Sequence, residues 1–147
     1  MPRPDTSEVD AAIIAYLSAD AELMALLPDG VYWDLSTLGT TQYVLVSQLV
    51  HEDVDTLDSG AAWERITYLV KGVTQGSSGT TVKEAAHRIY ELLQHGTFAI
   101  DGFALVLCRR AERVRYVEVE ETTDTRWQHR GGHYEVWVSP LSVALAA

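Results

Sequence analysis

The chain has 147 residues, of which 47% are apolar and 22% charged, and residues 1–147 are expected to form one globular domain with a real core. Its single cysteine, Cys108, excludes an internal disulfide, and apolar stretches such as Phe103–Cys108 are too short to cross a bilayer. The N-terminus lacks the apolar region of a signal peptide, and the formal net charge of −10 argues against tight, non-specific DNA binding.

The N-terminal segment, residues 5–27, predicts helix, because its apolar residues recur at intervals of three and four. Asp5-x-x-Glu8 fits a capping box, in which each of the two side chains bonds the other residue's backbone N–H; Thr6 and Ser7 are alternative caps. The expected buried stripe consists of Val9, Ala12, Ile13, Tyr16 and Leu17.

A second short helix, two strands and a loop follow. Asp20 interrupts the apolar stripe and can cap a helix that stops at Pro28–Gly30. Val31–Trp33 predicts a short strand, and Gln42–Val50 predicts a longer one because its side chains alternate in character. Residues 51–60 are rich in carboxylates and are expected to form a polar loop.

The centre of the chain predicts a strand, a connection and a helix. Trp63–Val73 has the apolar alternation of a strand, and the Gly/Ser-rich segment Gln75–Thr80 predicts a flexible connection. Thr81-x-x-Glu84 fits a second capping box at the start of a helix. His95-Gly96 is expected to end this helix, with Gly96 in the left-handed conformation.

The C-terminal part predicts strands only. A tight turn at Asp101-Gly102 is expected to join the first pair of strands, and the polar stretch Glu121–Gly131, around an exposed Trp127, lies between the second pair. The second pair would make a long hairpin arm spanning 114–139. The predicted strands are Phe98–Ile100 with Phe103–Arg110, and Val114–Glu120 with Gly132–Ser139.

The order of these elements is helix, strands, helix, strands. It favours an α+β fold, with a mostly antiparallel sheet, two main helices packed on one face and the long hairpin arm. Helices and strands do not alternate regularly enough for a doubly wound fold. No linker or internal repeat divides the chain.

Two loop segments resemble phosphate or calcium sites, and both are incomplete. Gly79 is followed by Thr80, and Lys83 comes too late for the Gly-Lys-Ser/Thr sequence of a phosphate loop, so a flexible connection is favoured. Asp53, Asp55 and Asp58 lack the spacing of an EF-hand loop. A solvated loop, or one that meets a basic partner, is the favoured interpretation of these acids.

Catalytic residues are equally hard to assemble. His129-x3-His133 has a metal-like spacing but spans a predicted turn, so the two rings need not converge on a zinc ion. Cys108 stands beside Arg109 and Arg110, which would favour a thiolate, yet a buried structural cysteine is the more usual case. A small hydrolase or metal enzyme using these groups is the least favoured alternative, and we expect no catalytic residue, metal or cofactor.

The charges are divided unequally along the chain. Residues 1–60 carry eleven acids and one base, a formal −10, whereas residues 61–147 carry ten of each. Six arginines form a C-terminal cluster: Arg109, Arg110, Arg113, Arg115, Arg126 and Arg130. One interpretation of this cluster is a subunit or partner contact, because arginine is enriched at interfaces. The other is a solvated strand end paired with Glu112 and Glu118.

Several weak core patterns gain specificity from their order and together cover nearly the whole chain. They are the N-terminal helix running into Leu17–Leu23, then Leu26–Tyr32, Gln42–Ser47, Thr56–Asp58, Ala85–Leu93 and Gly132–Val138. In this order they resemble the small tail-completion, or tail-terminator, proteins of long-tailed bacteriophages, related prophages and gene transfer agents.

The resemblance implies a non-enzymatic virion protein that assembles in the host cytoplasm. Such proteins form a ring, usually a hexamer, on the head-proximal end of the tail tube, stop tube polymerisation and join the head-completion or connector protein. DNA passes through the lumen without specific binding, and no membrane is involved. A head-closure or neck adaptor protein is the related alternative.

Charge alone adds an expectation about contacts. Acids of one copy, either in the 51–60 loop or near the N-terminus, are expected to meet the arginines of a neighbour or partner. The expected interface residues are Asp53, Asp55, Asp58, Arg109, Arg110, Arg113, Arg115, Arg126 and Trp127.

Overall fold

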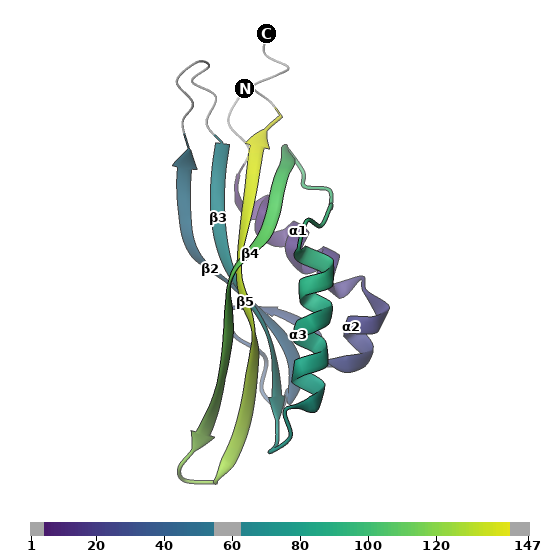
Figure 1. Ribbon diagram of the computed structural model, residues 1–147, viewed down its shortest axis with the longest axis vertical. Helices are drawn as coiled ribbons and strands as arrows, with labels where there is room; N and C mark the ends of the chain where they lie inside the picture. The colour runs from purple at the N-terminus through teal and green to yellow at the C-terminus, as the bar shows by residue number, and fades with distance from the viewer. Residues whose placement is uncertain (1–4, 55–62, 142–147) are drawn as a thin grey trace.

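The computed structural model describes residues 5–54 and 63–141, which contain one five-stranded sheet and three helices (Figure 1). The expected α+β class is confirmed. In chain order the elements are α1 (Ser7–Ser18), α2 (Ala21–Leu26), β1 (Val31–Trp33), β2 (Gln42–Val54), β3 (Trp63–Gln75), α3 (Thr80–Leu93), β4 (Phe103–Glu120) and β5 (Thr125–Pro140).

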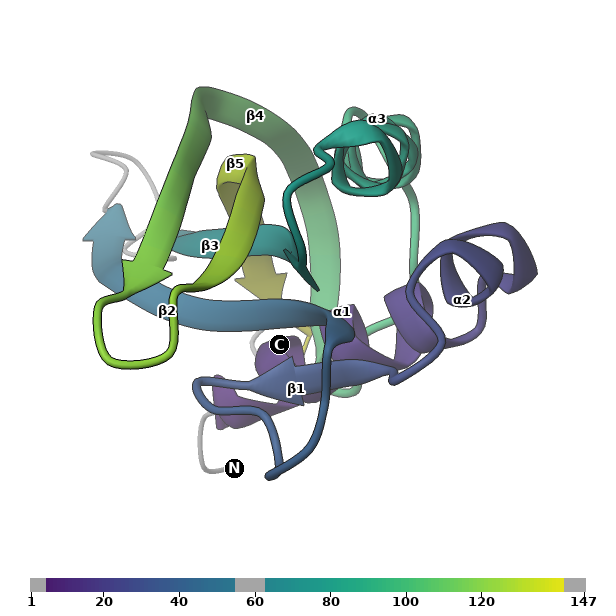
Figure 2. The ribbon, with the colours of Figure 1, turned by 90° about the horizontal axis from the view of Figure 1, so that it is seen from below.

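The sheet is mixed, with strand order β1-β2-β3-β5-β4. The short β1 runs parallel to β2, whereas β2 with β3, β3 with β5, and β5 with β4 are antiparallel. The last strand, β5, therefore lies between β3 and β4, and β4 forms an edge. Figures 1 and 2 show the three helices on one side of this sheet, with the β4–β5 hairpin extending beyond α3.

The first helix begins at Ser7 without the predicted capping box. Thr6 is the N-cap residue but makes no side-chain cap, and Asp5 Oδ1 accepts a hydrogen bond from the Ser7 backbone N–H at 3.0 Å. The expected stripe is present at every fourth position, and Val9, Ile13 and Leu17 are fully buried. Packing of this stripe, rather than the cap, fixes the helix.

Asp20 has the predicted capping role at α2. Its Oδ2 accepts a hydrogen bond from the Leu23 backbone N–H at 2.9 Å, which satisfies one of the free N–H groups at the helix start. The same carboxylate receives two hydrogen bonds from the Arg88 guanidinium on α3, at 2.9 and 2.7 Å. The cap of one helix is thus also its attachment to another.

Helix α3 begins one residue earlier than predicted and ends differently. Gly79 is the N-cap residue and no side-chain cap forms, so the Thr81/Glu84 capping box is wrong. At the other end His95, not Gly96, adopts the left-handed conformation with φ 55°. This turn brings the His95 backbone N–H within 2.8 Å of the Cys108 carbonyl oxygen on β4. His95 thus combines an unfavourable backbone angle with a hydrogen bond that connects the end of α3 to β4.

Two predictions about strands are also wrong. Strand β2 continues to Val54, so residues 51–54 pair with β3 and do not belong to a loop, while residues 55–60 lie outside the described part of the chain. In the C-terminal part Phe98–Ile100 is not a strand, since only an isolated bridge joins Ile100 to Phe103. The ladder hydrogen bonds across β2–β3 explain the longer strand.

The largest departure is that β4 is one continuous strand from 103 to 120. Two irregularities in its pairing with β5, between Leu105 and Leu107 and between Arg110 and Glu112, bend it without ending it. The arginines of β4, from Arg109 to Arg115, therefore lie in mid-strand and not at a strand end. The predicted stretch Glu121–Gly131 is likewise mostly strand, because β5 already begins at Thr125.

The core lies between the sheet and the helices. It joins the α1 and α3 stripes to inward-facing side chains of the three central strands, and Tyr68 and Tyr134 are its largest fully buried members. Tyr16 of α1 closes one end by donating a hydrogen bond to the Leu92 carbonyl oxygen at 2.9 Å. Burial of these apolar side chains supplies the main stabilisation of such a domain.

Candidate functional site

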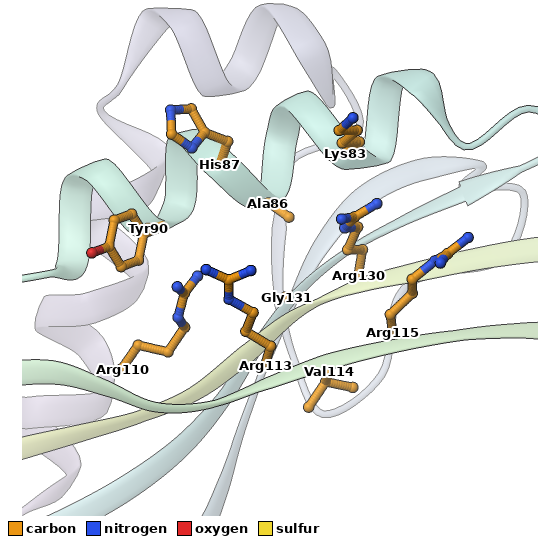
Figure 3. A pocket seen from close by; sticks show the side chains of 10 residues that line it. All are labelled: Lys83, Ala86, His87, Tyr90, Arg110, Arg113, Val114, Arg115, Arg130 and Gly131. Atoms are coloured by element: carbon orange, nitrogen blue, oxygen red, sulfur yellow. The ribbon is translucent and has the colours of Figure 1, made fainter.

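A basic groove lies between α3 and the β4–β5 hairpin (Figure 3). Its volume is about 450 Å³, and its charged side chains come from three successive elements, α3, β4 and β5. We call it the basic groove. It is lined by Lys83, Ala86, His87, Tyr90, Arg110, Arg113, Val114, Arg115, Arg130 and Gly131.

Regular periodicity brings the groove's cations together. Lys83 and His87 are four residues apart on α3 and therefore share one helix face. On the hairpin, Arg115 pairs directly with Arg130 across the β4–β5 ladder, and Arg113 lies two residues before Arg115 on the same side. The two like-charged arginines in direct register repel each other, which is unfavourable unless an anion lies between them.

One end of the groove is fixed by Arg110. Its guanidinium carbon lies 4.0 Å from the centre of the Tyr90 ring, a cation–π contact between β4 and α3. Its backbone N–H donates a hydrogen bond to Gln94 Oε1 at 2.8 Å. Arg110 is therefore a structural contact as well as a source of charge.

The groove floor requires glycine. A Cβ atom added at Gly131 would lie 2.1 Å from the Val70 carbonyl oxygen and 2.5 Å from Lys71 Cα, which are both backbone atoms. At Gly132 it would lie 2.7 Å from the Glu112 carbonyl oxygen. Only residues without a Cβ allow β5 to approach its neighbours this closely.

The groove's outer cations lack anionic partners within the described part of the chain. No carboxylate there lies within ion-pair distance of Lys83, Arg113, Arg115 or Arg130, although other arginines are paired. The two glutamates expected to neutralise the cluster contact histidines instead, Glu112 with His133 at 3.5 Å and Glu118 with His129 at 3.2 Å. The predicted alternative of a self-paired strand end is therefore wrong for these two acids.

A second hollow of about 440 Å³ continues the basic groove toward the start of α3. It shares Lys83, Arg115 and Arg130 and adds the backbone around Gly79 and Thr80. The combined surface presents several donors to an anionic chain, and it suits carboxylates or phosphates through charge-assisted hydrogen bonds.

The predicted interface residues are distributed over several places. Arg110, Arg113 and Arg115 line the basic groove, whereas Arg109 lies elsewhere and pairs with Glu135 at 3.1 Å. Arg126 is exposed outside it. Trp127 is half-buried, not exposed as predicted, and donates a hydrogen bond from Nε1 to Glu120 Oε1 at 3.1 Å. Asp53 lies in β2, and Asp55 and Asp58 lie outside the described residues.

Sequence reasoning missed Lys83 and left Arg130 out of the interface set. Both line the groove, but neither is near the Arg109–Arg115 segment in sequence. The signal for Lys83 was its place on the polar face of the amphipathic helix. Placing Arg130 in the groove requires the register of β4 against β5. Two bulges shift this register, so it cannot be predicted by counting residues along the sequence.

The two candidate histidines of the hairpin are held by different partners. His129 is buried, stacks on Tyr116 with ring centres 4.3 Å apart, and contacts Glu118. Burial lowers the pKa of His129, and the nearby Lys71 charge lowers it further. His133 is paired with Glu112, so each histidine has its own glutamate neighbour.

Cys108 is a buried thiol, as the favoured interpretation predicted. It is 1% exposed and belongs to the hydrophobic core. Burial raises its pKa to about 12, because a thiolate loses its hydration in an apolar environment. The neighbouring arginines of β4 therefore do not activate it.

A model of the tail completion protein gp17 family matches residues 11–139, which is most of the chain. The chain belongs to this family. The resemblance seen in the sequence is thereby confirmed, and so is a location in the virion tail.

A solved structure shows the same fold. It is a chain from the virion of a native gene transfer agent particle, with a TM-score of 0.65 and 22% sequence identity over 89% of this chain and 94% of that one. No curated protein sequence matches the chain. Within residues 5–54 and 63–141, none of the helices has the length and hydropathy needed to cross a membrane.

Proposed function

We propose that copies of this tail completion protein form a ring, a hexamer by the family resemblance, on the head-proximal end of the tail tube. The ring stops tube polymerisation and offers the surface to which the head-completion or connector protein binds. Family membership and the shared fold with a chain of a virion particle support this role. The basic groove is the observation that carries it, because its outer cations have no anionic partner within the described residues and can therefore bind the acids of another chain.

The acids that meet the groove come, in this proposal, from a neighbouring copy. Asp53 in β2, together with Asp55 and Asp58 beyond it, supplies carboxylates close to one another in the sequence, and the N-terminal acids are the alternative source. A head-to-tail contact between an acidic and a basic surface closes into a ring when its rotation is suitable. Arg126 and Trp127 on the hairpin arm contribute further contacts.

The remaining acids have a separate use. Of the formal charge of −10, all the excess comes from residues 1–60. A surplus of carboxylates on the lumen side of a ring repels DNA phosphates, so that DNA passes without binding. The protein acts by assembly and not by catalysis.

The charge pairing is tested by reversal. The double variant Arg113→Glu, Arg115→Glu is expected to weaken assembly at least tenfold at low salt, and combining it with Asp53→Lys is expected to restore part of the loss. Arg110 is left intact because it packs on Tyr90. Light scattering across a salt series measures the effect, and unchanged assembly of the double variant at every salt concentration would refute the pairing.

The tail-end role needs a partner test. Purified protein is mixed with assembled tail tubes or with portal-adaptor rings, and co-sedimentation and negative-stain images show which of the two it binds. Binding to the head-proximal tube end is the expected result. Binding only to portal-adaptor rings would instead establish the neck-adaptor role, and a protein that ignores tube ends would refute the terminator role even if it is monomeric alone.

A further inference from the structure

Three metal-ligating side chains meet at the far end of the β2–β3 ladder, away from the basic groove. His51 and Asp53 are two residues apart on β2 and point to one face of the sheet, and Asp53 pairs in register with Glu64 on β3. One donor atom from each side chain lies within 4.8 Å of the other two. This triad differs from both metal patterns seen in the sequence, because it combines a histidine with acids from two strands.

The distances are close to those of a coordinated ion. With metal–ligand bonds of about 2.0–2.2 Å, two donors of a tetrahedral site are about 3.3–3.6 Å apart. His51 Nε2 and Glu64 Oε1 are already separated by 3.3 Å. The other pairs must approach by at most about 1.5 Å, and Asp53 is exposed, so its side chain can rotate toward the other two.

Burial divides the three ligands into one fixed and two accessible groups. The Glu64 side chain is 6% exposed, whereas His51 is 30% exposed and Asp53 lies at the surface. A fixed ligand reduces the ordering that binding requires, and the open side leaves room for water as a further ligand.

The two carboxylates of the triad favour a cation. Asp53 and Glu64 pair directly across the β2–β3 ladder, where like charges repel each other. An ion bound between them would offset this repulsion.

We propose that His51, Asp53 and Glu64 bind one divalent transition-metal ion of the zinc class, with water completing its coordination. The imidazole nitrogen selects such ions over calcium and magnesium, which prefer oxygen ligands alone. Binding would join β2 to β3 and reduce the negative charge at this end of the sheet. The site shares Asp53 with the charge pairing proposed above, but its test requires neither ring formation nor the tail-end role.

The test uses the metal-free full chain. Calorimetric titration with Zn²⁺ is expected to show one tight site per chain, and Co²⁺ is expected to give the visible absorption of a low-symmetry site. His51→Ala and Asp53→Asn are expected to weaken Zn²⁺ binding by at least about tenfold. The matched control is His87→Ala, which should leave Zn²⁺ binding unchanged. His87 lies on α3 and its side chain is 71% exposed.

Two outcomes would overturn the site. A wild-type chain that takes up no Zn²⁺ is one, and a His51→Ala chain that binds Zn²⁺ as tightly as the wild type is the other, because binding would then arise at other histidines. Both variants replace exposed or half-exposed side chains, and circular dichroism verifies their fold. Zn²⁺ should also raise the unfolding temperature of the wild type and of His87→Ala but not of His51→Ala.

Discussion

The Asp20 carboxylate stabilises the domain in two ways, and its replacement separates them. It caps α2 through the Leu23 N–H, and it receives two hydrogen bonds from Arg88 of α3. Both side chains are sheltered, with 15% of Asp20 and 23% of Arg88 exposed. A sheltered, bidentate pair is stronger than an ion pair in open solvent.

The expected cost follows from these contacts. Loss of the cap in Asp20→Ala removes about 1 kcal/mol, and loss of the charged hydrogen bonds removes about 2 kcal/mol more. Asp20→Asn retains a cap acceptor and should cost about 2 kcal/mol or less. For a domain of this size, a loss of about 3 kcal/mol lowers the unfolding temperature by about 6–12 °C.

Urea unfolding followed by circular dichroism measures these free energies. Glu22→Gln is the matched control, because Glu22 also contacts Arg88, at 3.3 Å, but is 65% exposed, and it should cost less than about 0.5 kcal/mol. Hydrogen bonds from Arg88 lower the pKa of Asp20, so its contribution is present above the ordinary aspartate pKa and is lost as the pH falls through the lower folded value. The reasoning fails if Asp20→Ala costs no more than Glu22→Gln, or if the gap between wild type and Asp20→Asn persists in strong acid.

Three further predictions concern the hairpin and the core. Gly131→Ala should lower the free energy of unfolding by at least about 2 kcal/mol, because its Cβ would meet the Val70 carbonyl oxygen. Gly79→Ala, which meets no clash but replaces the N-cap residue of α3, should cost about 1 kcal/mol or less. Denaturant unfolding compares them, and equal stabilities would contradict the clash. The Cys108 thiol should react with a disulfide reagent only in denaturant, and rapid reaction of the native chain would contradict its burial. Burial lowers the pKa of His129, so its neutral form stabilises the fold above the ordinary histidine pKa, and this contribution is lost as the pH falls through the lower folded value. In urea unfolding, a His129→Gln chain should therefore lose less stability than the wild type on acidification. Equal losses in the two chains would refute this.

The sequence predicted the elements that depend on local periodicity. The α1 stripe at Val9, Ile13 and Leu17, the cap at Asp20 and the class of the fold all follow from spacings of three, four and two residues. Buried Cys108 was predicted as well. These features need no knowledge of which strands are neighbours.

The failures depend on pairing between distant segments. Residues 51–54 look like an acidic loop, but ladder hydrogen bonds to β3 hold them in a strand. Arg110 and Arg113 look like the ends of two strands, but a bulge carries β4 through them. The basic groove itself joins Lys83 to Arg130 only because β5 lies between β3 and β4. Register and strand order, and not composition, place these charges.

The edge position of β4 has a consequence for solubility. Beyond Arg110, no strand among the described residues pairs with its outer side, and Val117 and Val119 near the hairpin tip are about half exposed. Such an edge invites uncontrolled strand addition and aggregation. Glu118 and Glu120 alternate with these valines and act as gatekeepers, because an identical strand added there brings further carboxylates beside them. Because of the same charges, a strand is expected to add at this edge only if its basic residues lie opposite these carboxylates.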